Sequence, residues 1–416
     1  MLASVLRPLF RAALLPIGLA ALLAGCAGRS RTTSPPSSAD ADADVEATAA
    51  DGFSRGADAP AAEPTAAPEE VLAQAEAALA SNEAARAVAL FGRVLLTDQL
   101  SPEQAGPAWI GLAQAHEKLR DCIAASRAYE TYLSRFPAGE HAIVARARRG
   151  ACEAELQQWE DSAATFHAIA QLPDQLPSVQ VEALAREGYA LFMLDRFEQA
   201  DARLAEADAI YQRAVEQQTE RFGSYYFIGM ARFYRAAIIH RRFRDVEIRL
   251  PEKAMEAAFK AKLDLLVEAQ EAYNHTISAK HMFWVSAAGF QLGHLFSELY
   301  DALMYAPVPE WLDAHQREVY FEELKEQLRP VVTKAIWVFE KNLETARRLG
   351  YENDFIERTE AKLGHLQAVL LSEEATFGQP HQRLVRAGDE AIDAPRTDGA
   401  GAASDRKLFV PRPTAL

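Results

Sequence analysis

The residues best suited to chemistry are His294 and Glu298, which lie one helical turn apart. On a helix, side chains four positions apart share a face, so this pair could bind one ion. A metal site needs three or four ligands, and the only further histidines nearby in the sequence are His275 and His281. A histidine that makes an ordinary hydrogen bond is the better interpretation of His294. We therefore expect neither a metal nor another cofactor.

Sequence motifs typical of catalysis are absent. The chain has no phosphate-binding glycine loop, no Gly-x-Ser-x-Gly turn and no His-Glu-x-x-His helix. None of its carboxylates lies in an apolar setting that would raise its pKa for acid–base work. We expect no catalytic residues. The alternative, an envelope enzyme acting on peptidoglycan or another cell-wall substrate, would require titratable groups that converge in a cleft.

Cys122 and Cys152 are a second candidate pair. We expect Cys122 early in the second helix of one helical pair and Cys152 late in the first helix of the next. If those helices are antiparallel neighbours, both sulfurs lie near one end of the contact. A disulfide closing this 31-residue loop would stabilise the fold by about 3–4 kcal/mol in the chain-entropy model. The alternative is two buried thiols whose Cα atoms are more than about 7 Å apart, and the sequence leaves both open.

The segment 221–244 is basic and aromatic in an otherwise acidic chain. It holds six arginines, seven aromatic residues and no acid. Aromatic residues and arginine dominate the energetic hot spots of interfaces, so Arg232 and Arg235 are predicted to dock an anionic partner, either a protein or a lipid headgroup. The alternative is a core helix whose long arginines extend outward to solvent.

These residues must be positioned by helices, because apolar residues recur at spacings of three and four from residue 68 to about 376. The pattern also repeats. Small residues at Ala75, Ala113, Gly150 and Gly188 are spaced by 38, 37 and 38 positions. A second small residue follows each of them by twelve positions, and a bulky one comes four further on: Ala87/Phe91, Ala125/Tyr129, Ser162/Phe166 and Ala200/Leu204. Two small residues let paired helices approach closely while the large side chain fills the space beside them.

The second of these units resembles the tetratricopeptide repeat, with histidine where that consensus has tyrosine. The matching positions are Trp109, Leu112, Ala113, His116, Ala125, Tyr129, Tyr132 and Pro137. The period exceeds the usual 34 residues, which implies longer turns. The stretch 127–137 is also similar to the repeats of two periplasmic families, BamD and the TolA-binding coordinator. The resemblance covers about residues 68–210 and implies an all-α helix–turn–helix solenoid that binds proteins.

Such a solenoid has a concave groove lined by the first helix of each unit. In the second unit the predicted groove residues are Ile110, Gln114 and Glu117. In the fourth they are Tyr189, Phe192 and Met193. An apolar strip flanked by acids suits an extended or helical peptide. The alternative is that C-terminal helices cover and bury Phe192 and Met193.

After four repeats in residues 68–217, longer helices are expected in residues 218–376. Their predicted ranges are 223–244, 251–278, 280–304, 311–349 and 353–375, with Pro330 as a point where the fourth could break. Ala306-Pro307-Val308-Pro309 must interrupt helix, because each proline removes a hydrogen-bond donor and makes its predecessor extended. The run from Pro307 to Phe339 is similar to C-terminal parts of gliding-motility repeat lipoproteins. Residues 377–416 are expected to be a disordered tail.

Residues 1–25 have the form of a lipoprotein signal peptide. Arg7 and Arg11 precede the apolar run 12–23, which is too short to span a membrane. The run ends in Leu23-Ala24-Gly25-Cys26, which resembles the bacterial lipobox, and this resemblance implies an acylated Cys26 at the mature N-terminus. Residue 27 is not aspartate, which by the same resemblance favours the periplasmic face of the outer membrane. Residues 26–67 lack large apolar side chains and are expected to be a disordered tether.

Overall composition limits the function classes further. The chain has 416 residues, 49% of them hydrophobic, and a formal net charge of −15. General nucleic-acid binding requires a basic face, which this acidic balance does not supply. Three cysteines are too few for a disulfide-dense scaffold. We therefore expect a membrane-tethered periplasmic scaffold that binds protein partners in an envelope assembly, for outer-membrane biogenesis, pilus assembly or gliding.

Overall fold

The computed structural model describes residues 67–97 and 100–375 of the chain. Its described part consists of helices joined by short turns, with no strand, as the sequence predicted. The predicted signal peptide, Cys26, most of the tether and the tail 377–416 lie outside the described residues. Among the described helices, none is long and apolar enough to cross a membrane.

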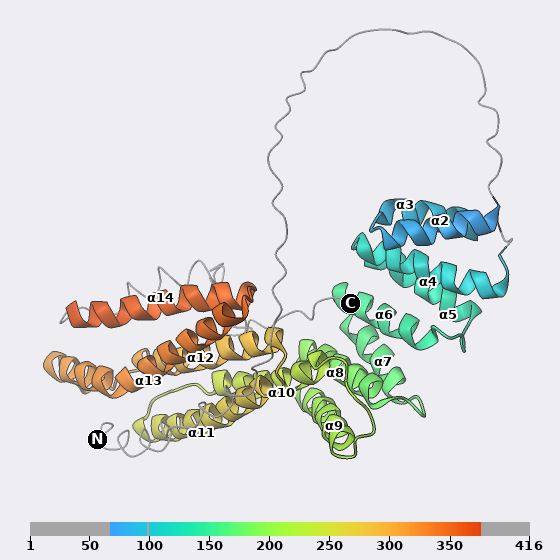
Figure 1. The fold of residues 1–416 in the computed structure, drawn as a ribbon. Coiled ribbons are helices and arrows are strands. Elements are labelled where there is room, and N and C mark those ends of the chain that lie inside the picture. Colours follow the sequence, from blue (N-terminus) through green and yellow to red (C-terminus); the bar gives the residue numbers. More distant parts are fainter. Residues whose placement is uncertain (1–66, 98–99, 376–416) are drawn as a thin grey trace, which may run out of the picture.

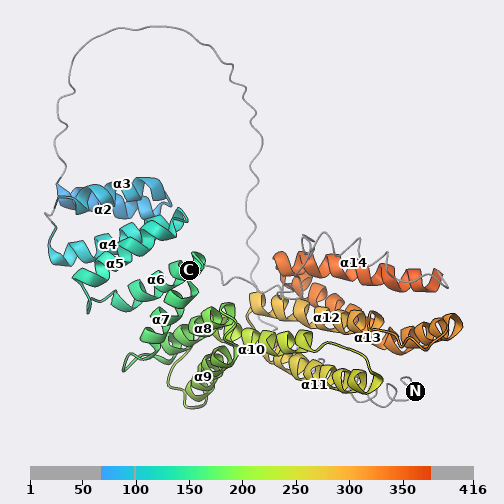
Figure 2. The ribbon, with the colours of Figure 1, turned by 180° about the vertical axis from the view of Figure 1, so that it is seen from behind.

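Eight helices in the first half form four antiparallel pairs, each helix packing on its neighbours in sequence. Figures 1 and 2 show them stacked in chain order from α2 to α9. Their bounds are α2 Pro68–Ala80, α3 Ala84–Leu95, α4 Pro102–Lys118, α5 Cys122–Arg135, α6 Ala142–Glu155, α7 Trp159–Ala170, α8 Pro177–Met193 and α9 Phe197–Glu216.

All twelve positions picked out by the repeat are buried at the contacts between paired helices. A small residue is required at the first position of each unit, because the bulky residue of the same unit occupies the space where a larger side chain would lie. A Cβ atom added at Gly188 would lie 2.5 Å from Leu204, and one added at Gly150 would lie 2.9 Å from Phe166. The side-chain pattern therefore explains why each pair of helices packs in this register.

A second periodic feature was not anticipated from the sequence. The turn inside each pair contains one residue with a left-handed backbone, φ between 57° and 62°, seven positions after the first small residue. These residues are Asn82, Arg120, Gln157 and Asp195. Glycine usually takes this place after a helix because it has no Cβ to clash. Here four different side chains accept the strain, so the turn geometry repeats although its residue type does not.

Five longer helices follow. They are α10 Tyr226–Asp245, α11 Glu252–Ile277, α12 Met282–Met304, α13 Ala314–Leu349 and α14 Asp354–Ala375. Each begins and ends close to the predicted residues. Pro330, where the sequence allowed a break, does not interrupt the helix, because α13 continues through it. Pro330 and Glu326 are both exposed, so water can satisfy the carbonyl that the proline leaves without a donor.

The main hydrophobic core does not stop at the predicted boundary between residues 217 and 218. One large cluster joins side chains of α8 and α9 to those of α10–α14, and Trp284 lies at its centre, fully buried. α10 packs on α8, α9, α11 and α12. The fourth repeat thus shares its hydrophobic core with the C-terminal helices. α2–α7 extend away from it, as both views show.

Candidate functional site: the repeat groove and a buried histidine cluster

The residues predicted to line the groove of the repeats differ in exposure between the second unit and the fourth. Gln114 and Glu117 on α4 are partly exposed, whereas Ile110 is only 6% exposed and belongs to the core of its unit. Glu117 pairs with Arg148 of α6 at 3.0 Å. Burial raises the pKa of Glu117 above its ordinary value, and the guanidinium of Arg148 only partly offsets this. The expectation that no carboxylate lies in a setting that raises its pKa is therefore wrong.

In the fourth unit, α10 covers the predicted groove residues. The Tyr189 ring lies 4.9 Å from that of Tyr234, and the Phe192 ring lies 5.2 Å from the same residue. Tyr189 and Phe192 are buried, and Met193 is partly buried against the same core. Of the two interpretations of these residues, the structure favours capping by the C-terminal helices.

The basic aromatic segment is a core helix, α10. Phe233 and Tyr234 are fully buried. Arg232 is 8% exposed and lies 2.8 Å from Asp208 on α9. Arg235, partly exposed, lies 2.9 Å from Asp201 on the same helix.

Both arginines pair with acids of α9 in the same chain, whereas the sequence analysis expected an external anionic partner. Arg232 is not accessible to an external partner. Arg235 remains partly exposed beside Asp201. Their ion pairs instead fasten α10 to the last repeat.

The two cysteines are close neighbours and both are free thiols. Cys122 is partly exposed at the start of α5, and Cys152 is buried in α6. Burial raises the pKa of both thiols, and each also affects the other. The expected proximity is therefore present, and a disulfide stays one of the two alternatives that the sequence left open.

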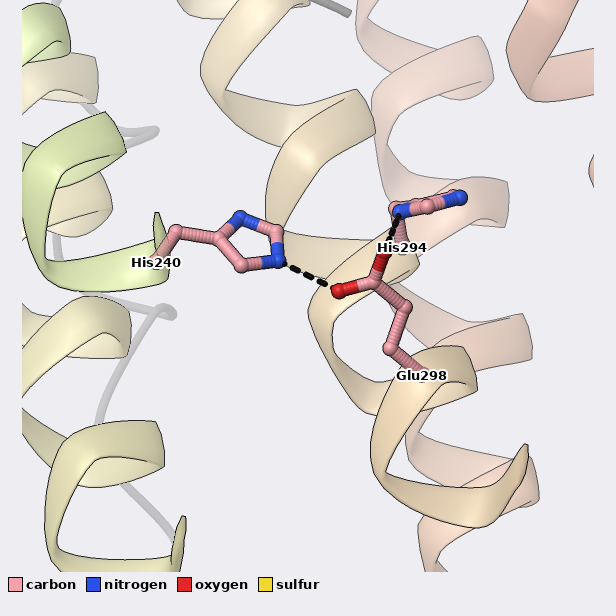
Figure 3. A group of neighbouring side chains, drawn as sticks. All are labelled: His240, His294 and Glu298. Atoms are coloured by element: carbon pink, nitrogen blue, oxygen red, sulfur yellow. Dashed lines mark hydrogen bonds and ion pairs between the residues drawn. The ribbon is translucent and has the colours of Figure 1, made fainter. Parts of the chain in front are cut away.

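The pair His294 and Glu298, which the sequence singled out, is joined by His240, which it did not (Figure 3). Glu298 lies between the two histidines: its Oε2 is 2.8 Å from His240 Nε2, and its Oε1 is 3.1 Å from His294 Nδ1. His240 comes from α10, so 54 residues separate it in sequence from His294 on α12. No local spacing could have revealed it. The pairing of His294 with Glu298 on one helix face was the only available signal.

The two histidines that sequence analysis proposed as further ligands lie elsewhere. The His275 Nδ1 atom is 4.0 Å from Asp208, beside Arg232. The His281 ring packs 5.2 Å from Tyr226. The expectation that only these two could join His294 is wrong, because helix packing, not sequence distance, decides which histidine approaches.

Charge in the cluster is distributed unequally. Burial lowers the pKa of His240 to about 4, against the opposing effect of Glu298. Burial alone would raise the pKa of Glu298, but His294, His240 and Arg244 together outweigh it and hold that pKa well below its ordinary value. His240 is therefore neutral and Glu298 is ionised near neutral pH. Arg244, which donates to Glu298 Oε1, supplies the compensating charge.

The cluster does not form an open active site. His240 and Tyr273, whose hydroxyl lies 3.0 Å from His240 Nδ1, are both fully buried. A cell-wall polymer could not reach these atoms. Titratable groups do converge here, as the enzyme alternative requires, but they converge in the core.

Comparison with known proteins adds little beyond the fold. No protein-family model matches the chain, and no curated protein matches it. A solved structure of a tetratricopeptide repeat protein from Parabacteroides merdae is similar at 13% sequence identity, with a TM-score of 0.34, over 70% of this chain and 96% of that one. So distant a likeness says nothing about function, and the all-α repeat architecture is established by the helices and their packing.

Proposed function

We propose that the chain is a membrane-tethered helical-repeat adaptor that binds protein partners in a bacterial envelope assembly. The repeats α2–α7 are the binding part, and the C-terminal helices are a rigid base. Cys26, as the acylated residue, and residues 26–67, as the tether, would hold the body at the periplasmic face of the outer membrane.

The observation that carries this proposal is that α2–α7 lie free of the C-terminal region. Within the described chain, the helices α10–α14 pack substantially on α8 and α9 but not on the earlier repeat helices. The groove therefore remains accessible where Glu76 is exposed and Gln114 is partly exposed, at equivalent positions of consecutive units. A stack with an accessible face and a fixed base suits the binding of an extended or helical segment.

The side chains that line the groove indicate which kind of peptide segment it would bind. Unit two presents Glu117 with its partner Arg148, and unit three presents Ala147 and Ala154, both partly exposed. Small side chains leave room for a bulky residue of the ligand, while the acids favour a segment that carries basic residues.

The test is in-cell crosslinking from a photoreactive amino acid placed at Gln114. The same group at His315, which is 85% exposed on α13, is the matched control. We expect Gln114 to capture one or a few defined envelope proteins and His315 not to capture them. Equal capture from both positions, or none from Gln114, would contradict the assignment of the groove.

The tether has a separate test. Cys26→Ser should prevent acylation and release the protein from the membrane fraction. When the purified variant is mixed with the captured partner, the photoreactive group at Gln114 should still form the crosslink. Retention of a lipid label on the Cys26→Ser protein would contradict the acylation of Cys26, but it would leave the assignment of the groove as the binding site unchanged.

A further inference from the structure

The side-chain cluster of α10 and α12 has the donors of a metal site. His240 Nε2, His294 Nδ1 and the Glu298 carboxylate each offer one ligand atom, and these atoms all lie within 4.8 Å of one another. Two imidazoles and one carboxylate are a donor set that zinc takes in proteins. Figure 3 shows both rings directed at the carboxylate from opposite sides.

The separations are close to those of a bound ion. Ligands at about 2.0–2.1 Å around a tetrahedral zinc lie about 3.3 Å from one another. The observed 2.8 Å and 3.1 Å differ from this by about half an ångström or less. Each histidine nitrogen is thus already near the distance from a carboxylate oxygen that a shared ion requires, and all three ligand atoms lie within 4.8 Å of one another.

His294 supplies a second, independent observation. It is 9% exposed, and its Nδ1 is buried without a hydrogen-bond partner within the described part of the chain. That nitrogen nevertheless faces Glu298 Oε1 at 3.1 Å. Either a proton on Nδ1 or a bound cation must lie between these two atoms, because two lone pairs at this distance would repel each other and buried polar atoms rarely remain unpaired.

Residues around the cluster hold the rings as ligands are usually held. The Tyr273 hydroxyl lies 3.0 Å from His240 Nδ1, the nitrogen that points away from the carboxylate. Such an outer contact fixes the orientation of a metal-binding imidazole. On the other side, the Phe290 ring stacks on that of His294 at 5.7 Å. We propose that His240, His294 and Glu298 bind one divalent transition-metal ion, with Zn²⁺ preferred, and so link α10 to α12.

Arg244 opposes this ion. Its guanidinium donates to the same Glu298 oxygen that faces His294, so it competes for the carboxylate and repels a second cation. This competition distinguishes a metal site from a purely structural cluster. If the cluster exists only to satisfy buried charges, removing Arg244 leaves Glu298 less well paired and creates no new affinity.

The experiment uses the full chain, stripped of metal by a chelator and titrated with Zn²⁺ by calorimetry and with Co²⁺ by visible absorption. We expect one ion per chain and the intense bands of four-coordinate cobalt, with water as the fourth ligand. His294→Asn should weaken binding about 100-fold or more, and Arg244→Gln should strengthen it about tenfold. His315→Asn, an exposed histidine on α13, should change nothing.

Two outcomes would overturn the proposal. One is the absence of saturable zinc binding by the unsubstituted chain; the other is equal affinity in the His294→Asn and unsubstituted proteins. Circular dichroism verifies that the variants fold. If His294→Asn does not fold, the Arg244→Gln comparison decides, because unchanged or weaker zinc affinity in that variant contradicts the site.

Discussion

The early repeats and the C-terminal region pack their side chains in different ways. In α2–α7 the core is divided into small clusters, each built around one or two aromatic rings such as Phe91 or Tyr129 and shared with the first helix of the next unit. In α8–α14 one continuous core contains aromatic rings from many helices. The centroid of the Trp284 ring, for example, lies within 6.0 Å of the ring centroids of Phe233, Tyr234 and Tyr226.

This difference sets how far a local change is felt. Units that contact only their neighbours add their stabilities along the stack, whereas a single core with contacts distant in sequence unfolds as a whole. The early repeats can therefore adapt to a ligand while the C-terminal region stays fixed. Four predictions test this contrast, beginning with the largest expected effect.

The strongest test removes the buried ion pair between α9 and α10. Arg232→Ala leaves the carboxylate of Asp208, 6% exposed, without its main partner, so we expect a loss of about 3–5 kcal/mol in the free energy of unfolding of the large core. Arg235→Ala removes the neighbouring exposed pair with Asp201 and should cost about 0–1 kcal/mol. Urea unfolding followed by circular dichroism measures both. Similar losses in the two variants would contradict a special contribution of the buried Arg232–Asp208 pair to the large core.

The next test overfills the two kinds of core with the same side chain. A Cβ atom at Gly293 would lie 2.3 Å from Phe339, and one at Gly150 would lie 2.9 Å from Phe166. Gly293→Leu and Gly150→Leu should each cost about 1–3 kcal/mol or more. Hydrogen exchange should show faster opening throughout α8–α14 in the first variant and only in α6 and its neighbours in the second. Gly364→Ala, with open space around it, is the control.

A smaller effect is expected at the left-handed turns of the repeats. Gln157 has φ of 60°, a conformation that glycine adopts without strain. Gln157→Gly should stabilise the third unit by up to about 1 kcal/mol, because relief of strain exceeds the added entropy of the unfolded chain. The measurement is the unfolding midpoint of the repeats. Leu156→Gly, at the adjoining end of α6, should be destabilising, and a stabilising effect there would contradict this explanation.

The smallest effect concerns pH. The raised pKa of Glu117 means that the folded state binds this proton more tightly than the unfolded state. Its contribution to stability therefore falls as pH rises from the unfolded pKa, about 4.3, to the higher folded value. Glu117→Gln should remove that slope, whereas Glu76→Gln, on an exposed acid, should keep it. Urea unfolding at a series of mildly acidic pH values measures the difference.

The repeats were predictable because their chemistry is periodic. The recurrence of small and bulky residues at Ala113, Ala125 and Tyr129 predicts which helices pair, since those positions must lie at close contacts. Helix ends were predictable too, because prolines and turn residues act locally.

The functional residues were harder to place because their surroundings come from distant parts of the chain. Arg232 looks like an interface residue until Asp208 is found beside it, and Tyr189 looks like a groove residue until Tyr234 covers it. His240 approaches Glu298 only because α10 packs on α12. Composition identifies which residues favour a charged or aromatic partner, but not whether that partner is external.

The turns at Asn82, Arg120, Gln157 and Asp195 give the molecule a mechanical property. Each turn closes one helix pair with the same geometry, so the first half is a series of four rigid units whose turns recur every 37 or 38 residues. A pull on the N-terminal end would be taken up as a small rotation at each interface between units, because no contact spans several of them. The repeats would then act as a spring, which extends under load and protects the large core from the force.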